Sequence, residues 1–239
     1  MTIKEQFVDY LDQETVCEGY SVTHADKVRP TVLICHMWGG LGDFEKQKCR
    51  EIAELGYNAF AIDMYGKGIR GATLDENRAL MAQYIEDREN LQQRIIAALS
   101  AARSLATTDT NNIAAIGYCF GGLCVLDLAR TGADVKGVVS FHGLFDAPGN
   151  TTNNKVHAKV LALHGFEDPM VPSEKLTALA NELTKAGADW QIHAYGNTYH
   201  SFTNPAANSP ENGSAYNKEA DSRSWEAMSF FLKEIFASD

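Results

Sequence analysis

The chain has 239 residues, of which 31 are acidic and 21 basic, giving a formal net charge of −10 at pH 7. Because a protein that binds a phosphate backbone needs clustered cationic side chains, this balance argues against a nucleic-acid partner. No apolar run approaches the length of a membrane span, and the N-terminal stretch MTIKEQFVDYLDQETV has no apolar core of a signal peptide. We therefore expect no nucleic-acid partner and no membrane partner.

The cysteines are odd in number and lack the spacing of a metal finger. Such usage is typical of reduced thiols in a cytoplasmic protein rather than of a disulfide framework. The histidines also lack the spacing of a zinc site. We expect a cytoplasmic location, no bound metal and no cofactor. The five cysteines are Cys17, Cys35, Cys49, Cys119 and Cys124.

Strand-like and helix-like segments alternate over most of the chain. The predicted strands are short, apolar and rich in β-branched residues, as buried strands are. The predicted helices carry apolar residues at spacings of three and four. In chain order the sequence predicts a strand at 30–36, a helix capped by Asp43 and stopped by Gly56, a strand at 58–65, a helical region at about 75–105 with a break near 86–89, strands at 112–117 and 136–143 with a helix at 120–130 between them, a strand at 158–165, a helix from Ser173 to Gly187, a strand at 190–195 and a C-terminal helix that contains Trp225 and Ile235.

Alternating strands and helices of this kind form a mostly parallel central sheet with helices on both faces, so the predicted fold class is α/β. The sequence shows no internal repeat and no linker-like composition, which predicts a single domain over residues 1–239. Two stretches rich in Asn, Pro, Gly and Ser, residues 146–155 and 203–218, are predicted to be long loops.

The stretch AAIGYCFGGL, residues 114–123, places Cys119 between a predicted strand and a predicted helix. It fits the pattern Gly-x-nucleophile-x-Gly, in which the nucleophile has a strained backbone in a very sharp turn. Gly117 and Gly121 then stand where the turn leaves no room for side chains. The N-terminus of a helix that begins at Phe120 favours a thiolate. On this stretch alone, a tight turn of small residues is an equally good interpretation.

Two later loops supply partners for a nucleophile. In open α/β sheets, functional groups lie on loops beyond the carboxyl ends of the strands. The stretch FEDPMVP offers Asp168 and also Glu167, and His200 follows the last predicted strand. Each has a plain structural explanation, since Asp168 precedes a proline and His200 lies in a polar loop. The chain order Cys119, Asp168, His200 is nevertheless the order nucleophile, acid, histidine of α/β-hydrolases, which favours a catalytic triad.

An acyl-transfer site also needs two backbone N–H groups that stabilise an oxyanion. The first is predicted to be the amide of Phe120, directly after the nucleophile. The second is expected from the loop CHMWGGLGD, residues 35–43, where a Gly-Gly pair permits a close approach. Met37 or Trp38 can present that amide, and we assign it to Met37.

Three motifs together resemble those of the dienelactone hydrolase family. GYCFGG resembles the family's nucleophile turn, and HGFEDPMVP and YHSF resemble its acid and histidine segments. The resemblance extends from about Thr15 to the C-terminal helix. It implies an α/β-hydrolase fold and a Cys-His-Asp triad that acts on esters or lactones, with the three roles taken by Cys119, Asp168 and His200.

The sequence departs from the family pattern at two positions. The resemblance places a glutamate where this chain has His36, and an arginine, which holds a substrate carboxylate, where it has Asn204. Dienelactone itself is therefore not the substrate we expect. Arg70 and Arg78 are the remaining candidates for binding an anion. The residues predicted to bind substrate are His36, Trp38 and Arg70.

Two other functions fit parts of the pattern: a non-hydrolytic binding protein on the same fold, and a thiol redox protein that uses Cys119 and Cys124. Their spacing along one helix makes a disulfide between these two cysteines awkward. His142 and His164 are interpreted as satisfied histidines near the core. The prediction is a hydrolase of a small-molecule ester or lactone, present as a monomer or small homo-oligomer.

Overall fold

Buried strands flanked by helices form the centre of each part of this chain. The computed structural model describes residues 2–25 and 27–237. The chain divides into two compact units, Met1–Ile116 and Gly117–Asp239. The expectation of a single domain over residues 1–239 stays a prediction.

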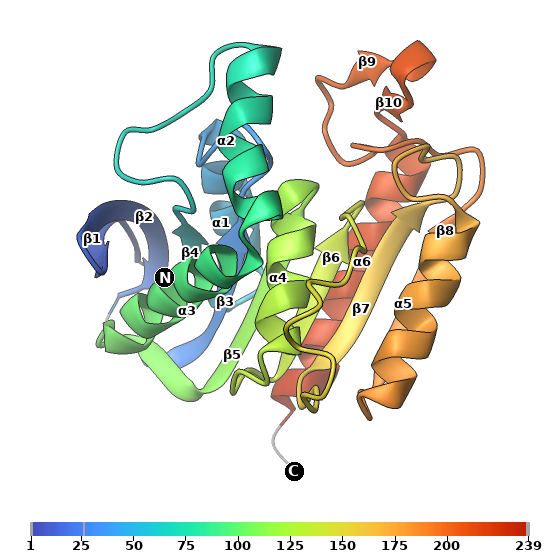
Figure 1. Ribbon diagram of the computed structural model, residues 1–239. Coiled ribbons are helices and arrows are strands. Elements are labelled where there is room, and N and C mark those ends of the chain that lie inside the picture. Colours follow the sequence, from blue (N-terminus) through green and yellow to red (C-terminus); the bar gives the residue numbers. More distant parts are fainter. Residues whose placement is uncertain (1, 26, 238–239) are drawn as a thin grey trace. The chain divides into compact units, whose positions relative to one another are not determined.

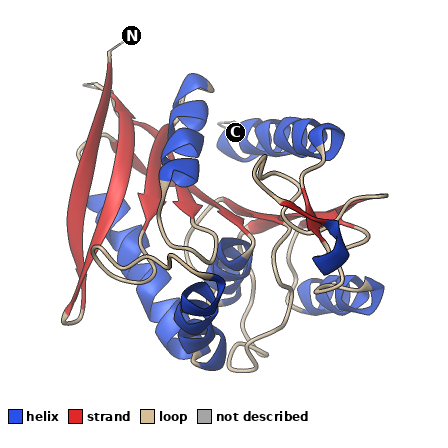
Figure 2. Cartoon of the chain, turned by 90° about the horizontal axis from the view of Figure 1, so that it is seen from above, coloured by secondary structure: helices blue, strands red, loops and turns tan. Residues whose placement is uncertain are grey.

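The first unit contains five strands in the spatial order β1-β2-β4-β3-β5. β3 and β4 run parallel, with Thr31 opposite Asn58 and Cys35 opposite Ile62, whereas β2 is antiparallel to both β1 and β4. Helix α1 lies on one face of these strands and α3 on the other (Figure 1, Figure 2). The elements are β1 (Ile3–Asp12), β2 (Thr15–His24), β3 (Arg29–Cys35), α1 (Asp43–Glu54), β4 (Asn58–Ile62), α2 (Leu74–Glu86), α3 (Arg88–Ser104) and β5 (Thr108–Tyr118), whose last two residues belong to the second unit.

The sequence pattern does not predict the hairpin of β1 and β2. On β1 the large apolar side chains of Ile3, Phe7 and Leu11 are exposed, while the charged Asp12 is buried. Asp12 is tolerated there because Arg94 donates to its carboxylate at 2.5 Å. An apolar-out, charged-in strand hides the alternation on which strand prediction depends.

The long helical region breaks where the sequence predicts a break, at Asp87. This residue ends α2 and caps α3, and its side chain accepts a hydrogen bond from the amide of Asn90 at 3.0 Å. The expected cap at Asp43 is wrong by one residue, because Gly42 is the N-cap of α1 and Asp43 begins the helix.

The second unit is built on three parallel strands, β6, β7 and β8. Val139 of β6 lies opposite Leu161 of β7, which lies opposite Gln191 of β8. Helices α4 and α5 lie on one side of these strands and α6 on the other (Figure 1, Figure 2). The predicted α/β class is confirmed. The elements are α4 (Phe120–Arg130), β6 (Gly137–Phe141), β7 (Lys159–Gly165), α5 (Ser173–Lys185), β8 (Trp190–Tyr195), β9 (Asn208–Ser209), the short 3₁₀ helix η1 (Pro210–Asn212), β10 (Ser214–Ala215) and α6 (Lys218–Phe236).

Candidate active site

Cys119 lies in the turn between Tyr118, the last residue of β5, and Phe120, the first residue of α4. Its φ and ψ are 55° and −115°, an unfavourable conformation for a residue with a side chain. The Cys119 amide donates to the carbonyl of Phe141 at 3.0 Å, and its own carbonyl accepts from the amide of Gly122 at 3.0 Å. The side chain is partly exposed and forms no disulfide. The strained turn therefore holds a free thiol in a fixed place.

Two glycines make this turn sterically feasible. A Cβ atom on Gly117 would lie 2.0 Å from the carbonyl oxygen of Gly121, which no adjustment of a side chain could relieve. A Cβ atom on Gly122 would lie 2.6 Å from the hydroxyl of Ser140 and 2.7 Å from the Cα of Gly143. The first turn of α4 thus crosses the end of β6 at backbone distance.

His200 and Asp168 form a buried pair. Nδ1 of His200 lies 2.6 Å from Oδ2 of Asp168, and both residues are about 2 % exposed. The other carboxylate oxygen accepts from the amide of Met170 at 2.9 Å. Glu167, the alternative acid in the sequence, has an exposed side chain. The structure therefore brings Asp168, and not Glu167, to the histidine.

Close backbone contacts hold the two loops together. A Cβ atom on Gly165, at the end of β7, would lie 2.6 Å from the carbonyl oxygen of Thr198. The amide of Glu167 donates to that same carbonyl at 2.9 Å, and the amide of His200 donates to the carbonyl of Gly213 at 2.9 Å. The loop that carries the acid is thus joined to the loop that carries the histidine at Thr198, and the bond to Gly213 fixes His200 within its own loop.

Cys119 completes the group by its effect on His200. Burial by itself lowers the pKa of His200, but the charge of Cys119, hydrogen bonding to Asp168 and the charge of Asp168 together raise the pKa to about 10. Because Nδ1 is bound to Asp168, Nε2 is the nitrogen left to face the sulfur, and it has no hydrogen-bond partner among the described residues.

Two more histidines lie fully buried at the ends of β6 and β7. Nε2 of His142 lies 2.8 Å from the hydroxyl of Thr203, but Nδ1 of His142 and both ring nitrogens of His164 have no partner in the described part of the chain. The interpretation as a satisfied histidine is therefore wrong for His164 and holds for only one of the two ring nitrogens of His142. Burial lowers the pKa of each, and so both rings are neutral at pH 7.

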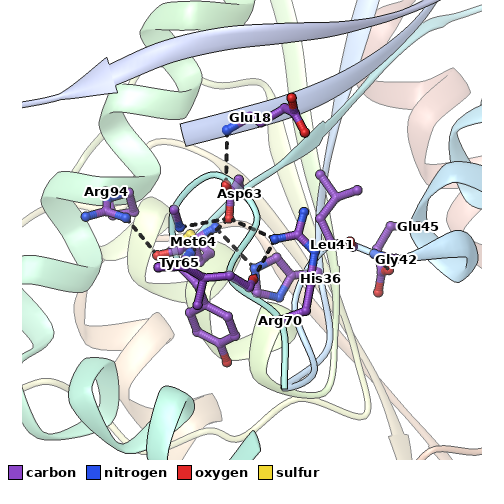
Figure 3. A network of polar contacts seen from close by, with 12 residues as sticks. Glu18, His36, Leu41, Gly42, Glu45, Asp63, Met64, Tyr65, Arg70 and Arg94 are labelled. Carbon is purple, nitrogen blue, oxygen red and sulfur yellow. Dashed lines mark hydrogen bonds and ion pairs between the residues drawn. The ribbon is translucent and has the colours of Figure 1, made fainter. Parts of the chain in front are cut away.

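In the first unit, His36 lies in a network of polar contacts at the end of β3 (Figure 3). Nε2 of His36 accepts from the amide of Met64 at 3.1 Å, so the proton sits on Nδ1, which donates to the carbonyl of Met37 at 2.6 Å. Burial lowers the pKa of His36 to about 4. The neutral ring of His36 thus links the segment after β3 to the segment after β4 through Met37 and Met64. Its predicted role in substrate binding stays a prediction.

Glu45 is a residue of this loop that the sequence reasoning missed. Its buried carboxylate accepts from the amide of Gly42 at 2.8 Å through Oε2 and from the amide of Met37 at 3.2 Å through Oε1. Burial raises its pKa. The signal was present, because an acidic residue three positions after a helix cap is a common capping arrangement. The Met37 amide, predicted to face an oxyanion, therefore already has an acceptor.

Arg70 is tied to backbone carbonyls in the same network (Figure 3). Its Nε donates to the carbonyl of Leu41 and one terminal nitrogen donates to that of Ile69 at 2.6 Å. The same nitrogen lies 3.8 Å from the buried carboxylate of Asp63, which in turn accepts from the amide of Tyr65. Arg70 thus joins the loop after β3 to the loop after β4. Its predicted role in binding substrate stays a prediction.

The remaining candidates lie in the first unit as well. Trp38 is half-buried, and its carbonyl accepts from the hydroxyl of Tyr65 at 2.9 Å. Arg78 is exposed and pairs with Asp75 at 2.9 Å. Over residues 2–25 and 27–237, no group of three or more His, Cys, Asp or Glu side chains is arranged to hold a metal ion. Within the same residues, no helix has the length and apolar character that crossing a membrane requires.

Known proteins resemble this chain over nearly its whole length. The sequence profile described as the dienelactone hydrolase family matches residues 17–236. The crystal structure of a dienelactone hydrolase-like promiscuous phosphotriesterase, P91 from metagenomic libraries, is 36% identical, with a TM-score of 0.92, and covers 99% of this chain and 100% of its own. A protein of Aquifex aeolicus provisionally named carboxymethylenebutenolidase is 27% identical over 95% of this chain and 97% of its own. The structure of MGS-M1, an α/β-hydrolase from a deep-sea metagenome library, is 18% identical, with a TM-score of 0.66, over 97% of this chain and 98% of its own.

A cysteine in a strand–turn–helix elbow, followed in the chain by a buried acid–histidine pair, is the arrangement of the α/β-hydrolase fold. The chain belongs to the dienelactone hydrolase family. It is accordingly an enzyme that hydrolyses carboxylic esters or lactones.

We expect Gly117→Ala to lower the free energy of unfolding by about 3 kcal/mol or more, because the new methyl group would overlap a backbone oxygen in a turn that cannot open. Gly196→Ala is the matched control, since no atom lies within 4 Å of its added Cβ, and it should stay within about 0.5 kcal/mol of the wild type. Urea denaturation of both variants measures the difference. Equal stability of the two would show that the turn tolerates a side chain at Gly117.

Proposed function

We propose that Cys119, Asp168 and His200 form the catalytic triad with which this protein hydrolyses esters or lactones. The observation that carries the proposal is the buried contact of 2.6 Å between Asp168 and His200, together with the partly exposed Cys119, whose charge raises the pKa of the same histidine. An activated nucleophile next to a base that is oriented by a third group is the signature of covalent catalysis.

In the first step the thiolate of Cys119 attacks the carbonyl carbon of the substrate. His200 takes the proton of the thiol, and its raised pKa of about 10 favours the charged imidazole. Asp168 accepts from Nδ1 and so fixes the ring with Nε2 toward the sulfur. The tetrahedral intermediate collapses when Nε2 gives its proton to the leaving alkoxide, and a thioester on Cys119 remains.

The oxyanion of the intermediate is assigned to the amides of Phe120 and Met37. Phe120 is the first residue of α4, where the positive end of the helix stabilises negative charge. The Met37 amide now donates to Glu45 at the rather long distance of 3.2 Å. An oxyanion would compete with that carboxylate for the proton, and the Phe120 amide would therefore contribute the larger share.

In the second step the thioester is hydrolysed. His200, neutral after it has protonated the alkoxide, takes a proton from a water molecule that attacks the thioester carbon. The thiolate leaves and the acid product forms, which restores the charged histidine. Because a thiolate leaves more readily than an amine, esters and lactones are better substrates than amides. The cycle uses no cofactor.

Neutral substrates suit the residues that follow the triad histidine. Asn204 stands where the family resemblance places a carboxylate-binding arginine, and its side-chain oxygen accepts from the amide of Ala206 at 3.0 Å. The side chain is thus used within its own turn and supplies no positive charge. We infer that the substrate is an uncharged lactone or short acyl ester.

Phosphotriester hydrolysis is a second candidate activity, because P91, the similar protein described above, is named a promiscuous phosphotriesterase. A phosphotriester is also uncharged, and the attack of a thiolate on its phosphorus likewise puts negative charge on one oxygen. An activity screen should therefore include one neutral phosphotriester beside the esters and lactones.

We also propose that the protein works in the cytoplasm as a monomer or small homo-oligomer. Five free cysteines, one of them partly exposed and next to a histidine, are compatible with a reducing compartment. Size-exclusion chromatography with light scattering would determine the oligomeric state.

Cys119→Ala should reduce kcat for ester hydrolysis by about 10⁴-fold or more, because no other group replaces the nucleophile. The fold should persist, since the side chain is partly exposed. Cys119→Ser should retain only a small fraction of the activity, because a hydroxyl needs stronger help from the base than a thiol does. Steady-state kinetics on a chromogenic ester measures both, with circular dichroism as the control for folding. Wild-type rates in the alanine variant would remove Cys119 from the mechanism.

Asp168→Asn should reduce kcat by about 10²–10⁴-fold, because an amide can hold His200 in the wrong tautomer. Glu167→Gln is the matched control one residue away, and its exposed side chain should change kcat by less than about threefold. If the order of the two effects were reversed, the acid of the triad would be Glu167.

Wild-type enzyme should hydrolyse a neutral lactone with a higher kcat/KM than a carboxylate-bearing dienelactone. Asn204→Arg should narrow this gap, because one charge-assisted contact contributes about 1.5–3 kcal/mol. Asn204→Met, which is long but uncharged, is the control and should leave the gap unchanged. The measurement is kcat/KM for both lactones in all three proteins. A wild-type preference for the charged lactone would reject the inference and direct attention to Arg70 or Arg78.

A further inference from the structure

The imidazole of His142 contacts that of His200 edge to face. The ring centroids are 5.1 Å apart and the ring planes meet at 67°. Nδ1 of His200 is bound to Asp168, but Nε2 has no hydrogen bond to any described residue, and a single hydrogen bond leaves a ring free to rotate. A contact from a second ring removes this freedom.

His142 is held in a conformation that histidine seldom adopts. Its φ is 38°, in the left-handed region, where a glycine would be free of strain. Its amide donates to the carbonyl of Leu163 at 2.8 Å, which ties the residue to the end of β7. Strained backbone of this kind persists only where the surrounding contacts determine it, and such residues gather at functional sites.

The ring itself is fixed from two more directions. Nε2 lies 2.8 Å from the hydroxyl of Thr203, and the ring of Phe202 packs against it with centroids 5.1 Å apart and an angle of 79°. Thr203 and Phe202 lie in the same loop as His200. The residues that hold His142 therefore belong to the loop that carries the triad histidine, so the two rings keep a constant relation.

His142 contributes no charge to this arrangement. Burial, and next the charge of His200, lower the pKa of His142 well below its usual value, so the ring is neutral throughout the range in which His200 titrates. The titratable groups around the pair are Cys119 at the start of α4, Asp168 after β7 and His164 at the end of β7. Removal of His142 would accordingly take away a contact and leave every charge in place.

We propose that His142 is a positioning residue, whose ring holds the plane of His200 so that the triad histidine meets Asp168 and Cys119 at the same time. The inference rests on the proposed role of His200 in the reaction. It assigns no contact with the substrate to His142.

The test is the titration of His200, followed through the NMR signal of its ring proton, together with kcat and KM of the full-length enzyme. In wild type the signal should titrate near pH 10. His142→Ala should move this titration down by at least one pH unit and lower kcat by about tenfold or more, with KM within about threefold. His142→Phe, which keeps a flat uncharged ring, should restore most of both. A histidine with a merely structural role would change stability and leave the titration of His200 where it is.

His164→Ala is the control, because it removes an equally buried imidazole at the next strand end and should leave the His200 titration near pH 10. If His142→Ala fails to fold, the same measurements are made on Thr203→Val, which removes the hydrogen bond that holds the His142 ring. Thr203→Ser, which keeps the hydroxyl, is the control for that variant. An unchanged titration and unchanged kcat in the deciding variant would overturn the positioning role. Wild-type activity of His200→Ala would reject the proposed function itself, which is a separate outcome.

Discussion

The strained turn at Cys119 is the constraint on which the rest of the site depends. A side chain at φ 55° and ψ −115° is held in place because Gly117 and Gly121 approach within a distance that excludes any Cβ atom. Gly122 in the first turn of α4 likewise lies close to the end of β6, and the Cys119 amide is bound to the carbonyl of Phe141. A sulfur fixed in this way can be reached by a base without loss of conformational entropy, because the two groups are already held in position.

Buried imidazoles in this protein are charged or neutral according to their partners. His200 is buried next to the carboxylate of Asp168 and the sulfur of Cys119. Both groups oppose the effect of burial and raise the pKa of His200. His142 and His36 are as deeply buried but are bound to a hydroxyl or to backbone groups, so that desolvation prevails and their pKa values fall. The same side chain is thus a charged group in one place and an uncharged one in the others.

The loop after β3 shows how many polar contacts a short irregular segment can require. Its backbone groups are bound by Glu45, Arg70 and the hydroxyl of Tyr65, each from a different part of the first unit. Buried amides and carbonyls without partners would be costly, which explains why the carboxylate of Glu45 is kept in a buried place. Such a loop is rigid, and a rigid loop is the kind that can present an amide to a developing charge without reorganisation.

The sequence by itself determined the alternation of strands and helices, the helix break at Asp87 and the chain order of Cys119, Asp168 and His200, because periodicity, caps and turn residues are local properties. It favoured Asp168 over the adjacent Glu167 as the acid, and it did not reveal the hairpin of β1 and β2. Three contacts are visible only in the tertiary structure: Asp168 with His200, the Met37 amide with Glu45, and the His142 ring with the His200 ring. These contacts join residues far apart in the chain, and their energies arise from burial and from the pairing of buried polar groups, which no local pattern of residues records.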